Sequence, residues 1–81
     1  MKAKIYITLK RGIHDPQGHA IHQSLTTLGF EAVNDVRLGK LLEVDIEEPD
    51  QEKAEATVQG MCKKLLANPV IENYRYELSS S

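Results

Sequence analysis

The sequence has little that would support a disulfide, a membrane span or nucleic-acid binding. Its 81 residues contain one cysteine, Cys62, so no intrachain disulfide can form, and a lone free thiol suits a reducing compartment. No apolar run is long enough for a secretory signal or a transmembrane helix. The net charge is -2, whereas nucleic-acid binders carry a clear basic excess. We therefore expect a cytoplasmic protein that binds neither membranes nor nucleic acids.

Residue types that serve in catalysis and metal binding are present, but their spacing does not match a known type of site. Three histidines lack acidic or cysteine partners at ligand spacing, so we expect them to be exposed and metal-free: His14, His19 and His22. Cys62 falls in an apolar helical stripe and is expected in the core, where a thiol is unreactive. The adjacent glutamates at 47 and 48 would point apart on an extended chain. No catalytic residue and no metal site are predicted.

Apolar residues alternate with polar ones in four segments, which predicts four strands. The first spans Lys4–Lys10, with Gly12 just beyond it. Val33–Leu38 and Leu41–Ile46 flank Gly39-Lys40, a connection short enough to predict an antiparallel hairpin. The first of these two strands is less regular near Asn34-Asp35, which allows a bulge or a late start there. The last strand is Val70–Leu78.

Two helices are predicted between these strands. Asp15-Pro16 is a helix start, because the carboxylate caps free N–H groups and proline suits the first helical position; the helix would run from Pro16 to Leu28. The second would open at Pro49-Asp50 and stop at Asn68-Pro69. Each has an apolar stripe expected to face the core: Ile21, Leu25 and Leu28 in the first, and Ala54, Val58, Met61, Cys62 and Leu65 in the second.

The predicted order is β-α-β-β-α-β, an α+β ferredoxin-like sandwich with a four-stranded antiparallel sheet and both helices on one face. Residues 1–78 would form one domain and 79–81 a frayed tail. The uncovered sheet face is either solvated or a docking surface for a second copy. It would carry Tyr6, Thr8, Leu41, Glu43, Asp45, Asn73, Arg75 and Glu77, together with Arg37.

Three motifs remain unexplained by this fold alone. They are Asp15-Pro16-Gln17-Gly18, Asp35-Val36-Arg37-Leu38-Gly39-Lys40 and Asn68-Pro69-Val70-Ile71-Glu72. Gly18 is costly early in a helix, which suggests close approach of another backbone. Turn and cap chemistry accounts for the motifs as well as partner contact does. In their order and spacing, the three motifs resemble the PurS family, the small subunit of phosphoribosylformylglycinamidine synthase, and the resemblance extends from the first strand to Leu78.

The resemblance implies a role in de novo purine synthesis. The enzyme converts formylglycinamide ribonucleotide, ATP and glutamine into formylglycinamidine ribonucleotide. ATP and glutamine are used by a large amidating subunit and a glutaminase subunit, and the PurS-like subunit bridges them as a homodimer or larger oligomer without catalytic residues or a cofactor of its own. The expected assembly contacts are Asp15, Pro16, Gln17, Gly18, Arg37, Gly39 and Lys40. Arg11 departs from the family, which often has proline there, and His14 stands where an apolar residue is expected.

Two other classes share the predicted element order. A regulatory ACT-like domain would bind a small molecule and dimerise. An acylphosphatase would need a Gly-rich phosphate loop after the first strand, but the segment from Arg11 to Gly18 places an acid and a proline where phosphate-binding amides are wanted. The ACT-like domain is the stronger of these alternatives.

Overall fold

The structure is a computed structural model that describes residues 1–80, and it is of the predicted α+β class. Its three strands are β1 (Lys2–Leu9), β2 (Gly39–Asp45) and β3 (Glu72–Ser79). Its helices are α1 (Pro16–Thr27) and α2 (Gln51–Met61), and the π-helical turn η1 (Cys62–Leu66) continues α2. None of these described helices has the length and apolarity needed to cross a membrane.

The sheet is antiparallel, with the order β2-β1-β3. Ile5 in the central strand lies opposite Leu42 and Tyr76, and Tyr6 lies opposite Leu41 and Arg75. Because side chains alternate across a strand, the odd positions of β1 enter the core and the even ones share the other face with their partners. This register confirms eight of the residues predicted for the uncovered face, from Tyr6 to Glu77. The prediction for Arg37 was wrong, because it precedes β2 and binds the turn after β1.

One face of the sheet is covered by α2. Ala54, Val58 and Cys62 recur every four residues and are fully buried, as the helical stripe predicted. Val58 and Cys62 belong to one buried cluster with the β1 residues Ala3, Ile5 and Ile7. Partly buried side chains complete this core: Leu42, Val44, Ile46, Met61, Leu66, Tyr74, Tyr76 and Leu78.

The predicted strand Val33–Leu38 is wrong, and so is its hairpin. Among the described residues the order is β-α-β-α-β, because residues 33–38 have no strand partner. Their polar backbone groups bond to side chains instead: the Leu38 N–H donates to Asp15 (2.7 Å) and the Val33 carbonyl meets His22 Nε2 (3.0 Å). The described residues therefore form three strands, without the fourth of a ferredoxin-like sheet, and the ACT-like alternative loses its structural basis.

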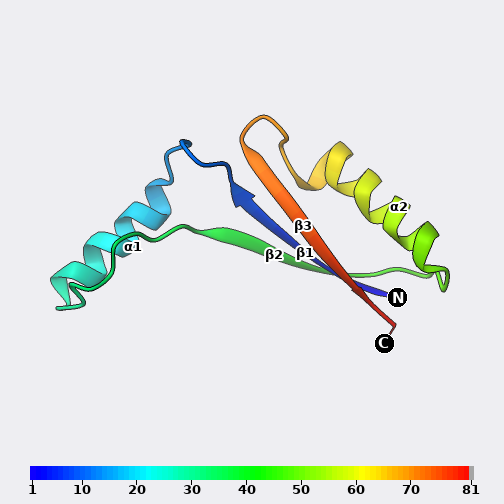
Figure 1. Ribbon diagram of the computed structural model, residues 1–81, viewed down its shortest axis with the longest axis horizontal. Helices are drawn as coiled ribbons and strands as arrows, with labels where there is room; N and C mark the ends of the chain where they lie inside the picture. Colours follow the sequence, from blue (N-terminus) through cyan, green and yellow to red (C-terminus); the bar gives the residue numbers. More distant parts are fainter. Residues whose placement is uncertain (81) are drawn as a thin grey trace.

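Helix α1 does not cover the sheet, contrary to the prediction. It lies beyond the ends of the strands, and the segment that follows it runs back beside it into β2 (Figure 1). We call residues 16–38 the arm. The described chain measures 49 × 28 × 14 Å, with a radius of gyration of 16.1 Å, against about 12 Å for a compact domain of this length.

Four large apolar side chains of the arm are exposed to solvent, while Leu25, Val33 and Val36 are half-buried. Gly18 is the only buried residue of α1. Ile21 is 40% exposed and Leu28 72%, so the predicted stripe of this helix does not face the core of its own chain. Phe30 is 57% exposed just beyond the helix.

The end of the second helix also departs from the prediction. The Ala67 N–H donates to the Cys62 carbonyl at 3.0 Å, five residues back, so the last turn is wider than an α-turn. The extra residue rotates Leu65 out of the stripe and leaves it 82% exposed. At the carboxyl end β3 continues through Ser79, while Ser81 of the predicted tail lies outside the described residues.

Candidate functional site

The arm joins the sheet at a cluster built around Asp15. Asp15 caps α1, its Oδ1 accepting the Gly18 N–H at 2.8 Å, while its Oδ2 accepts the Leu38 N–H at 2.7 Å. One carboxylate therefore links the start of the arm to its end. The Gly18 and Leu38 amides, then the Arg37 charge, hold the pKa of the Asp15 carboxyl below its ordinary 3.8, although partial burial acts in the opposite direction.

Arg37 makes a second link across the same junction. Its guanidinium donates to the carbonyl oxygens of Lys10, at 3.3 Å, and Ile13, at 3.0 Å. Both acceptors lie in the turn between β1 and α1. Both hydrogen bonds come from one terminal nitrogen, Nη2, whose two N–H groups point in fixed directions.

Gly18 makes the close approach possible. A Cβ at position 18 would collide with the Val36 carbonyl oxygen and crowd the Asp15 carboxyl group. The prediction that glycine permits another backbone to come near is confirmed. We call Asp15, Gly18, Val36, Arg37 and Leu38 the elbow; Leu38 and Val36 were not among the predicted site residues, because no sequence signal marks a backbone amide as the partner of a distant carboxylate.

The other predicted assembly residues are placed differently. Pro16 and Gln17 are exposed at the start of α1. Gly39 and Lys40 begin β2, opposite Thr8 and Ile7, and form no turn. The structure thus brings Asp15, Gly18 and Arg37 together, and leaves Pro16, Gln17 and Lys40 free at the surface. Partner contact by any of these residues stays a prediction.

Among residues 1–80, the three histidines and Asp15 take part in separate contacts. The rings of His14 and His19 lie 6.1 Å apart, and His22 points to the Val33 carbonyl. Within residues 1–80, no three metal-ligating side chains converge. The Asp15 carboxylate already accepts the Gly18 N–H in the first turn of α1, so an acyl phosphate bound there would face a negative charge.

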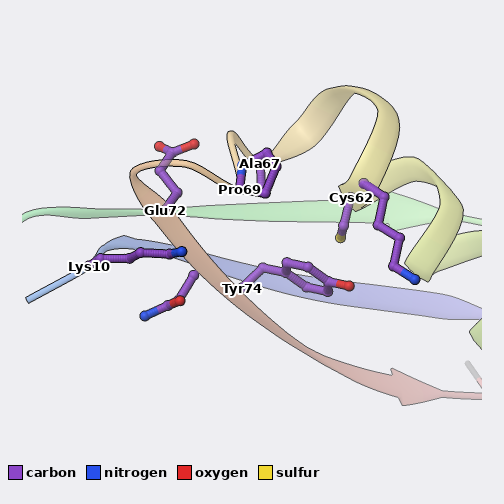
Figure 2. A pocket seen from close by; sticks show the side chains of 8 residues that line it. Lys10, Cys62, Ala67, Pro69, Glu72 and Tyr74 are labelled. Atoms are coloured by element: carbon purple, nitrogen blue, oxygen red, sulfur yellow. The ribbon is translucent and has the colours of Figure 1, made fainter.

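A hollow of about 380 Å³ lies between η1 and β3. It has a mainly apolar wall, in which Figure 2 shows Cys62, Ala67, Pro69 and Tyr74, with Lys10 and Glu72 toward one end. Cys62 is fully buried, and burial raises the pKa of its thiol. Glu72 accepts the Asn68 N–H at 2.7 Å, an interaction within its own loop. A protonated, buried thiol is a poor nucleophile.

The uncovered sheet face is polar and internally paired. The Arg75 guanidinium carbon lies 3.8 Å from the centre of the Tyr6 ring, a cation–π contact. Lys2 and Glu43 form a cross-strand ion pair at 3.7 Å. Leu41, 54% exposed, is the large apolar group on this face. The face therefore suits water better than the apolar side of the arm does.

Three comparisons with known proteins agree on one family. The model of the family PurS, described as phosphoribosylformylglycinamidine (FGAM) synthase, matches residues 2–80. The PurS subunit of this synthase from Bacillus subtilis is 47% identical over 77 residues, which are 95% of this chain and 90% of the relative.

Solved structures give the same result. PurS of Methanocaldococcus jannaschii, one of the subunits of formylglycinamide ribonucleotide amidotransferase in the purine biosynthetic pathway, superposes with a TM-score of 0.87 at 41% identity, covering 99% of this chain and 96% of that one. A chain in the PurLQS structure from Thermotoga maritima gives 0.86 at 33% identity, covering 94% and 93%. The motif resemblance is thereby confirmed, and this chain belongs to the PurS family of phosphoribosylformylglycinamidine synthase subunits.

Proposed function

We propose that this chain is the non-catalytic subunit of phosphoribosylformylglycinamidine synthase that joins the amidating subunit to the glutaminase subunit. The family assignment supports the enzyme, and the solved PurLQS complex of a relative supports an assembly with two further subunits, L and Q. The reaction would consume formylglycinamide ribonucleotide, ATP and glutamine. ATP and glutamine would be bound by the partners and not by this chain.

The arm is the observation that carries the proposal. Leu28 and Phe30 are more than half exposed, and Ile21 and Leu38 are each 40% exposed. An apolar surface projecting from a thin, elongated chain is stabilised when a protein partner covers it. A catalytic subunit would instead enclose its reactive groups in a cleft.

The first partner of this surface is a second copy of the chain, giving a homodimer or a tetramer. A small chain buries limited surface by itself, and β2 and β3 each have an outer edge without a strand partner among residues 1–80. Two copies related by a twofold axis would cover both arms at once. The hetero-subunits would then bind the assembled oligomer.

A cytoplasmic location fits this role. Cys62 is an unpaired thiol, and free thiols persist in reducing compartments.

The solution mass of the purified chain, measured by light scattering during gel filtration, tests the proposal. We expect a dimer or tetramer alone and a larger species when the L and Q subunits of the same organism are added. A monomer that forms no complex with either subunit would contradict both the self-association and the bridging role.

A further inference from the structure

Among residues 1–80, the elbow is the main contact that can fix the direction of the arm relative to the sheet. Gly18 is the one buried residue of α1, and the helix lacks substantial packing against the described strands. Both ends of the arm connect to the sheet, through residues 10–15 and through Leu38. Two flexible connections alone would let a 12-residue helix swing.

The elbow cross-links these two connections. Asp15 belongs to the first connection and binds the Leu38 amide of the second, at 2.7 Å and 23 residues away. Arg37 belongs to the second and binds carbonyl groups of the first, at Lys10 and Ile13. Both links have their donor in the second connection and their acceptor in the first, so a displacement of one connection against the other would stretch them.

The charges of the elbow are used inside the chain. Both carboxylate oxygens of Asp15 have a backbone donor, and Asp15 is only 6% exposed. Hydrogen bonds between backbone and an ionised group are stronger than neutral ones. Gly18 lets Val36 lie against the first turn of α1, which brings the Arg37 guanidinium and the Leu38 N–H within reach of their acceptors.

We propose that Asp15 and Arg37 are positioning residues that set the angle of the arm, and that they influence assembly without touching a partner. The angle decides whether two arms, or an arm and another subunit, can meet face to face. The effect on assembly rests on the proposed function; the effect on the arm itself does not.

The test measures the distance between the arm and the sheet domain by pulsed electron spin resonance. Nitroxide labels are placed on Gln23→Cys and Lys53→Cys, two exposed positions on α1 and α2, while the buried Cys62 stays unlabelled. Labelled chains are diluted with unlabelled chains, so that only distances within one chain are recorded. We expect one narrow distribution in the parent protein and a clearly broader one in Asp15→Asn and Arg37→Lys.

The matched controls are Asp35→Asn and Arg11→Lys. Asp35 accepts only the N–H of its neighbour Val36 in the described structure, and Arg11 is an exposed arginine at the same junction. Both should leave the distribution narrow. Arg37→Lys is decisive, because lysine keeps the charge that a partner would bind, but its nitrogen lies one bond nearer the backbone than Arg37 Nη2, which donates to both carbonyl oxygens.

Hydrogen exchange of the parent protein gives a second test, which does not depend on whether the variants fold. The Leu38 amide lies outside any strand, yet we expect it to exchange about tenfold or more slowly than an open amide, because it is hydrogen-bonded. A rapidly exchanging Leu38 amide, or narrow distributions in both elbow variants, would overturn the proposal. If Arg37→Lys stays narrow but still prevents binding of another subunit, Arg37 is a contact residue.

Discussion

The α-carbon of Gly18 faces the carbonyl oxygen of Val36, and a methyl group there would collide with it. We therefore expect Gly18→Ala to lower the free energy of unfolding by about 1–3 kcal/mol, the usual cost of inserting an extra carbon into a packed site. Urea denaturation followed by circular dichroism measures this difference.

Gly60 provides the matched control for Gly18. It also lies within a helix, but a Cβ there meets open space. Gly60→Ala should raise the free energy of unfolding by about 0.5–1 kcal/mol through helix propensity. Equal effects of the two substitutions would show that the backbone contact at Gly18 is unimportant.

Replacing Phe30 with serine should weaken self-association. Phe30 is 57% exposed on the arm, and covering a side chain of this size contributes about 1.5–3 kcal/mol. The dissociation constant of the dimer should rise roughly tenfold to 100-fold, as measured by analytical ultracentrifugation. Leu65→Ser is the control, because Leu65 is 82% exposed on η1, away from the arm. If only Leu65→Ser dissociates the oligomer, the interface lies at α2.

Acid should weaken the elbow through Asp15. Amide hydrogen bonds from Gly18 and then Leu38 lower the pKa of this carboxyl in the folded chain below 3.8. The ionised form is therefore favoured by folding, so its stabilisation is complete above about 3.8 and is lost as the pH falls from there through the lower, folded-state pKa.

The melting temperatures of the parent and of Asp15→Asn test this linkage. The parent should be the more stable at neutral pH, and the gap should narrow as the pH falls below 3.8. A carboxyl carbon of Asp15 that titrates above 3.8 in a nuclear magnetic resonance experiment would contradict the assignment.

The Cys62 thiol should be inert in the folded protein. It is fully buried, and its pKa is raised by that burial, so little thiolate forms and reagents lack access. Thiol-reactive dyes should label it only on unfolding. Cys62→Ser should destabilise the chain by about 1–3 kcal/mol, since a buried hydroxyl without a partner is costly. Fast labelling under native conditions would place Cys62 outside the core.

Local sequence patterns were sufficient where an element packs within its own chain. The alternation around Ile5 and Ile7 predicted the central strand, and the four-residue spacing of Ala54, Val58 and Cys62 predicted the covering helix. Asp15 was recognised as a cap because a helix start has a compact local signature. These are short-range or periodic signals.

The errors arose where the structure depends on a distant or absent partner. Residues 36–38 alternate like a strand, but backbone groups of Val33 and Leu38 bond to the His22 and Asp15 side chains. No local sequence pattern predicts such contacts. The apolar stripe of α1 predicted that its side chains would be buried. Such a pattern does not show whether the covering surface belongs to the same chain or to a partner. The prediction that Leu65 faces the core was wrong, because the wide turn after Cys62 changes the helix face on which Leu65 lies.

The same difference between local signals and distant contacts holds for the elbow. Asp15, Gly18 and Arg37 were selected as assembly residues from motif resemblance, and the structure brings all three to one junction. Their partners within the chain, the Leu38 amide and the Lys10 and Ile13 carbonyl groups, are backbone atoms that carry no residue-specific signal. The sequence therefore indicated residues of this junction, but not the hydrogen bonds that they make.

Glutamine-driven turnover by the L and Q subunits, with and without this chain, tests the bridging role most directly. Product formation from formylglycinamide ribonucleotide, ATP and glutamine is followed as this chain is added, and the isolated chain is assayed beside it. We expect no turnover by the chain alone and a rise to a plateau once it matches the other subunits in amount. Full glutamine-driven activity from L and Q without this chain would contradict the account.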